Sequence, residues 1–108
     1  MNLIPKNLFA NNVKEFIITV NAGKYYIDNS LTPQLILIRG FRYKFDQSHS
    51  SNQYHPLFFS PTQDGTHSGG STISQGFIAS GTAGSDRIVY FDVPRESSDK
   101  IYYYCGYH

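Results

Sequence analysis

Apolar and polar residues alternate along short segments of this chain, and this period of two is typical of β-strands with one buried face. The alternation is clear in residues 14–20, where Phe16, Ile18 and Val20 share one side, and again in residues 41–46. Turn-forming residues follow the first segment, as they follow strands. The chain shows no apolar stripe at helical spacing with suitable caps, so we expect an all-β protein.

Other segments predict further strands and the loops between them. Residues 35–38 are an apolar block bounded by Pro33 and Gly40, which predicts a buried strand. Residues 47–53 predict a surface loop, and residues 61–70, which are rich in glycine and proline, predict a long loop without regular structure. The remaining expected strands are residues 24–27, 56–60, 72–78, 87–93 and 100–105. Seven or eight short strands separated by turns predict a Greek-key β-sandwich.

Length and charge limit the organisation and the partners. A chain of 108 residues has room for one domain, which we expect at residues 14–108 after an N-terminal arm at residues 1–13. The formal net charge is +1 and the charged residues are scattered, so we expect no nucleic-acid partner. We see neither a signal peptide nor an apolar run approaching about 18 residues, so we expect no membrane span.

The candidate chemistry lies at the end of the sequence. Cys105 is the single cysteine, and it is in phase with Ile101 and Tyr103, so its thiol is expected to point into the sandwich. His108 follows three positions later, and His55 lies at the start of another expected strand. One sulfur and two imidazole nitrogens favour copper or zinc over calcium or magnesium. We therefore predict a metal site of His55, Cys105 and His108, with copper ahead of zinc and a metal-free domain as the open alternative.

Simpler interpretations of these residues remain. A cysteine is often a small buried apolar side chain, with no metal to bind. His49 and His67 lie in polar loops, where we expect solvated side chains rather than metal ligands. Cys105 and His108 could be imagined as a nucleophile and its base, but nothing marks an oxyanion site nearby. We expect no enzyme and no catalytic residues.

Seven motifs spread along the chain share their pattern with a known family. They are Lys24–Asp28, Leu35–Gly40, Phe45–Ser48, Ser51–Asn52, His55–Ser60, Asp64–Gly70 and Tyr102–His108. Together they resemble a cupredoxin-like domain of the kind found in structural and fibre-like proteins of marine phages and algal giant viruses. The resemblance covers roughly residues 16–108, and it implies that the copper ligands are His55, Cys105 and His108.

The resemblance also implies what this chain lacks and what it does. Cupredoxins continue past the second histidine to an axial methionine and a closing strand, whereas Met1 is the only methionine here. The missing strand leaves an open edge, so we expect a non-catalytic structural module of a virion or extracellular surface, completed by a protein partner through strand addition. The alternative is a small blue-copper electron-transfer protein, in which the copper cycles between two oxidation states.

Overall fold

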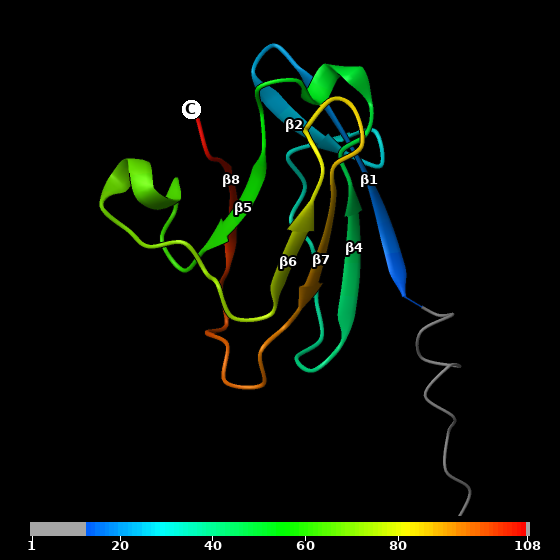
Figure 1. Ribbon diagram of the computed structural model, residues 1–108. Helices are drawn as coiled ribbons and strands as arrows, with labels where there is room; N and C mark the ends of the chain where they lie inside the picture. The colour runs from blue at the N-terminus through cyan, green and yellow to red at the C-terminus, as the bar shows by residue number, and fades with distance from the viewer. Residues whose placement is uncertain (1–12, 108) are drawn as a thin grey trace, which may run out of the picture.

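A computed structural model describes residues 13–107, which form strands, turns and two short 3₁₀ helices (Figure 1). Residues 1–12, most of the expected N-terminal arm, and His108 lie outside the described residues. The strands are β1 (Lys14–Asn21), β2 (Lys24–Ile27), β3 (Ser30–Leu31), β4 (Arg42–Asp46), β5 (Leu57–Ser60), β6 (Phe77–Ser80), β7 (Ile88–Asp92) and β8 (Tyr102–Cys105). The 3₁₀ helices are η1 (Ser50–Asn52) and η2 (Gly65–Ser68).

The strands form two sheets of unequal size. The large sheet has the order β3-β2-β1-β4-β7-β6, and the small sheet pairs β5 with β8. β1 and β4 run parallel and the other pairs run antiparallel, so the large sheet is mixed. Figure 1 shows the small sheet lying beside the large one as a separate layer. The prediction of an all-β fold is confirmed, and the Greek-key, cupredoxin-like identity stays a prediction.

Aromatic rings join the two sheets. Phe59 on β5 has its ring centroid 4.6 Å from that of Phe91 on β7, stacked, and 5.2 Å from that of Phe45 on β4, edge-on. All three side chains are at most 2% exposed. Because a buried aromatic ring removes about 150–250 Å² of surface from water, contacts of this kind dominate the energy of a small core. Phe59, together with the fully buried Leu57 on the same strand, therefore holds the two-stranded sheet against the large one.

The apolar block at residues 35–38 is not a strand, and that prediction is wrong. Leu35 and Leu37 pack against the core, whereas Ile36 is 88% exposed and Ile38 is 56% exposed. The alternation of a strand is present, but the segment pairs with no neighbouring strand within the described part of the chain.

Tyrosine hydroxyls bond to the ends of this segment instead. The hydroxyl of Tyr103 donates to the carbonyl oxygen of Pro33 at 2.7 Å, and the N–H of Ile38 donates to the hydroxyl of Tyr43 at 2.8 Å. Hydrogen bonds from two tyrosine side chains thus hold this part of the chain against the side of the core.

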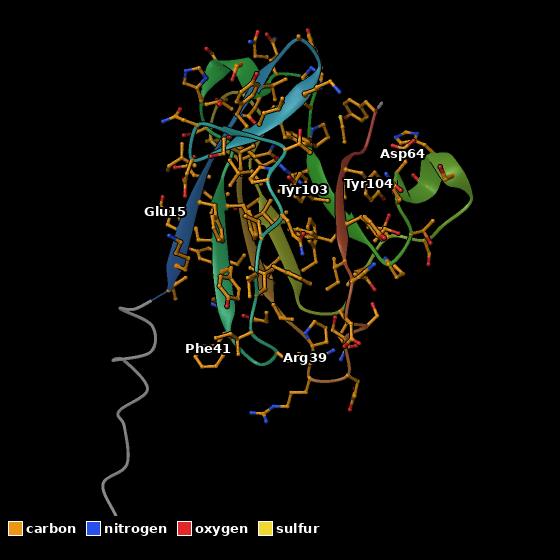
Figure 2. All side chains as sticks on the ribbon, turned by 180° about the vertical axis from the view of Figure 1, so that it is seen from behind. Glu15, Arg39, Phe41, Asp64, Tyr103 and Tyr104 are labelled. Carbon is orange, nitrogen blue, oxygen red and sulfur yellow. The ribbon has the colours of Figure 1, made fainter. Side chains whose placement is uncertain are left out.

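The expected strand at residues 72–78 is displaced: β6 begins at Phe77 and ends at Ser80, and before it the N–H of Ile73 donates to the carbonyl of Phe59 on the edge of β5 at 2.8 Å. The loop at residues 61–70 contains η2, contrary to the expectation of no regular structure. Gly65 has a φ of +54° and packs on the ring of Tyr104, with which an added Cβ would overlap. Tyr104 is consequently buried on the outer side of β8, beside the turn that carries Asp64 (Figure 2).

Replacing Phe91 with alanine tests whether the stacked rings hold the two sheets together. We expect the free energy of unfolding to fall by about 3–5 kcal/mol, because the variant loses a buried ring and leaves a cavity beside Phe59. Ile78 on β6 is 51% exposed, and Ile78→Ala is the control, with an expected change within about 0.5 kcal/mol. Urea unfolding measures both, and equal losses would contradict this packing.

Candidate metal centre

The predicted ligands His55 and Cys105 lie in contact at one end of the small sheet. β5 and β8 pair antiparallel with Leu57 opposite Cys105, so the residues just before β5 lie beside the end of β8. The Sγ atom of Cys105 is 3.6 Å from Nδ1 of His55 and 3.8 Å from the carbonyl oxygen of Tyr54. The structure thus brings together two of the three predicted residues, and the third, His108, lies outside the described residues.

The alternation along β8 sets the direction of the thiol. Cys105, Tyr103 and Ile101 all pack against the core, as their spacing in the sequence predicts. Tyr104, between two of them, faces the opposite side of the small sheet (Figure 2). Because Cys105 is the last residue of β8, its thiol lies at the rim of the core, partly buried and partly exposed.

The separation of the two side chains suits a shared metal ion. Ligand bonds of about 2.3 Å to sulfur and about 2.0–2.1 Å to nitrogen, at a tetrahedral angle, place the two ligand atoms about 3.6 Å apart. The observed Sγ to Nδ1 distance is 3.6 Å, and in the chain without metal this contact is a hydrogen bond between the two side chains. Within residues 13–107, no group of three or more His, Cys, Asp and Glu side chains gathers in a way that could hold a metal ion. The described part of the chain therefore supplies a ligand pair rather than a full ligand set.

Hydrogen bonds hold the backbone of His55 on both sides. Its N–H donates to the carbonyl oxygen of Asn52 at 2.8 Å. Its carbonyl oxygen accepts from the hydroxyl of Tyr25 at 2.7 Å and from Nε2 of Gln47 at 2.8 Å. Gln47 and Asn52 are fully buried, so the expectation of a surface loop at residues 47–53 is wrong for these two residues. Their amides turn inward because buried polar groups, including the carbonyl of His55, offer hydrogen-bond partners there.

Burial controls the charge state of the polar residues around the pair. Burial raises the pKa of Tyr25 far above its usual value, and the neighbouring Cys105 raises it further. Tyr25 is therefore a neutral hydroxyl donor to His55 at physiological pH. Burial is also the main cause that lowers the pKa of Arg87 from its usual value. Arg87 is only 8% exposed, and its guanidinium lies 5.2 Å from the ring centroid of Phe58.

The two loop histidines make contacts of other kinds. Nε2 of His67 is 2.8 Å from the carbonyl oxygen of Cys105, so this histidine binds the backbone of β8 and is not simply solvated. Nδ1 of His49 is 2.8 Å from the hydroxyl oxygen of Ser51. These contacts join the histidines to a backbone carbonyl and a serine, and neither contact is with the Cys105 thiol.

Sequence reasoning missed Tyr25, Gln47 and Arg87, which surround the ligand pair. The signal that could have found two of them is phase. Gln47 continues the inward positions of β4 two residues beyond Phe45, and Arg87 precedes the inward Val89 of β7 by two residues. A polar residue in phase with a buried face predicts a buried hydrogen-bond network.

Comparison of the chain with protein-family models, with curated proteins and with solved structures found no match. The cupredoxin-like and viral assignments therefore rest on the motifs of the sequence and stay predictions. Neither 3₁₀ helix among residues 13–107 has the length and apolar character needed to cross a membrane.

Tyr25→Phe tests the support of His55 from β2. The variant loses one of the two hydrogen bonds to the His55 carbonyl, so we expect the free energy of unfolding to fall by about 0.5–1.5 kcal/mol. Tyr26 is half-buried on the other face of β2, and Tyr26→Phe is the matched control, with a smaller expected change. Thermal unfolding followed by circular dichroism measures both variants. A loss from Tyr26→Phe as large as that from Tyr25→Phe would show that the His55 bond contributes nothing.

Proposed function

We propose that this chain is a non-catalytic, cupredoxin-like module that binds copper through His55, Cys105 and His108. The observation that carries the proposal is the contact of 3.6 Å between the Cys105 thiol and the His55 imidazole. A thiolate with imidazoles is a ligand set that suits copper and also zinc. A cysteine kept only as a small apolar side chain needs no imidazole beside it.

The spacing in the sequence supplies the third ligand. His108 follows Cys105 by three residues, and three residues span at most about 10 Å, so both side chains can reach one ion. Bound copper would supply a one-electron redox centre. The residues of the chain bind and orient it, and the buried bonds to the backbone of His55 limit how far its imidazole moves.

The edge of β8 that faces away from β5 supports a structural role in a larger assembly. Within the described residues β8 pairs with β5 alone. The N–H of Gly106 donates to the carbonyl of Pro56, so by the alternation of an antiparallel ladder the N–H groups of Tyr103 and Cys105 point away from β5. On this edge the carbonyl of Cys105 already bonds Nε2 of His67, so a strand from another chain would pair with the part of β8 before Cys105. By resemblance, that assembly is a virion or another extracellular surface.

A small electron-transfer protein is the second candidate function. Tyr54 and Tyr107, close in sequence to the ligands, are 66% and 69% exposed. Aromatic side chains are enriched in protein interfaces, so exposed tyrosines around a redox centre suit a transient partner. In this case the copper exchanges electrons, and β8 needs no added strand.

Titration with copper tests the proposed ligands. Adding Cu(II) to the reduced, metal-free protein should give an intense visible absorption and one copper per chain by elemental analysis. Cys105→Ser should abolish the absorption, because the band requires the thiolate. His49→Ala removes an imidazole whose Nδ1 is 2.8 Å from Ser51, and should leave the spectrum unchanged. A colourless protein without stoichiometric copper would contradict the proposal. If one zinc per chain is bound instead of copper, the ligands stand and only the identity of the metal changes.

Light scattering at high protein concentration separates the two candidate functions. The structural role predicts an assembly that Tyr102→Lys weakens, because a lysine on an edge strand opposes strand addition. Tyr107→Lys adds the same charge beyond the end of β8 and is the matched control, with no expected effect. A monodisperse wild-type monomer with no recovered partner would favour the electron-transfer candidate.

A further inference from the structure

We infer that Gln47 is a positioning residue of the candidate metal centre, and that its side-chain amide sets the place of His55. The inference rests on the proposed function for its metal-binding readout. It deepens that function by naming a buried residue that touches no metal and yet determines where one ligand lies.

The side-chain amide of Gln47 forms hydrogen bonds with the backbone on both sides of Pro56. Its Nε2 donates to the carbonyl oxygen of His55 at 2.8 Å, and its Oε1 accepts from the N–H of Leu57 at 2.8 Å. A neighbouring strand bonds in the same way, to the carbonyl of one residue and the N–H two positions later. The side chain of Gln47 thus takes the place of a strand on the edge of β5 that faces away from β8.

The partners of the amide allow only one orientation. Leu57 N–H and Arg87 Nε are donors, at 2.8 and 3.0 Å, so the atom that faces both must be the carbonyl oxygen Oε1. The NH₂ group therefore faces the carbonyl of His55 and Oδ1 of Asn52. Both donors and both acceptor sites of the Gln47 side chain are used, within a residue that is fully buried.

The backbone of Gln47 is fixed as firmly as its side chain. Its N–H donates to the carbonyl of Arg87 at 2.9 Å, and its carbonyl accepts from the N–H of Gly84 at 3.0 Å. Gln47 is thereby anchored to the large sheet at the start of β7 and reaches across to the small sheet. The position of His55 relative to Cys105 then depends on both anchors, Gln47 on one edge of β5 and β8 on the other.

The Gln47→Glu variant distinguishes a role of Gln47 in positioning His55 from a role in folding alone. Gln47→Glu keeps the size of the side chain, and one carboxylate oxygen still accepts from Leu57 and from the cationic Arg87. The other oxygen replaces the NH₂ group and meets two acceptors, the carbonyl of His55 and Oδ1 of Asn52. The hydrogen bond with Arg87 becomes stronger because both groups are then charged. The hydrogen bond to the carbonyl of His55 is lost.

The test compares copper affinity with stability in the full chain. We expect Gln47→Glu to weaken Cu(II) binding by about 10–100-fold in competition with a chelator, the usual effect of losing a partner that orients a ligand. Val89→Ala is the control: it opens the fully buried core on β7 and lowers stability, but should leave copper affinity unchanged. Unchanged affinity in Gln47→Glu, or an equal loss of affinity in Val89→Ala, would overturn the inference.

A second readout needs no metal and keeps failure of the proposed function apart from failure of this inference. If the wild-type protein binds no copper, the proposed function fails, and Gln47→Glu is judged in the metal-free protein by amide hydrogen exchange and a crystal structure. Faster exchange at Leu57 together with a displaced His55 would support the positioning role. An unmoved His55 would refute it.

Discussion

A fully buried side-chain amide, that of Gln47, holds the backbone around His55 against the large sheet. Burying an amide is costly unless its hydrogen bonds are made, so its partners are tightly constrained. Those partners are Asn52 in η1, His55 and Leu57 around Pro56, and Arg87 before β7. One side chain thereby ties the first residues of β5 to the large sheet. The position of the His55 backbone follows from this network, and its distance from Cys105 depends also on the pairing of β5 with β8.

The aromatic core supplies the other half of the constraint. A two-stranded sheet has little stability of its own, so β5 and β8 depend on packing against the large sheet. Phe59 provides much of that packing through its contacts with Phe45 and Phe91. The same alternation that buries Phe59 on β5 turns the facing side chains of β8 inward, Cys105 among them. Apolar packing thus sets the distance between the two sheets, and the hydrogen bonds of Gln47 set where the start of β5 lies against the large sheet.

The alternation of apolar and polar residues predicted those features of the structure that depend only on the sequence nearby. The period of two located β1 and β4 and the direction of the Cys105 thiol, because successive side chains of a strand alternate whatever its neighbours are. The continuous apolar block at residues 35–38 predicted a buried strand wrongly, because this extended segment has no strand beside it within the described residues. The contact between His55 and Cys105 depends on the register of β5 against β8, which periodicity does not specify. The ligand chemistry of a thiol and two imidazoles, and then the family motifs, brought these two residues together in the prediction.

X-ray absorption spectroscopy of the copper-loaded protein tests the central claim most directly, because it reports the atoms bound to the metal. The proposed centre predicts one sulfur and two imidazole nitrogens around the copper, from Cys105, His55 and His108. Copper bound only by nitrogen and oxygen would contradict it, since Cys105 would then lie outside the metal site.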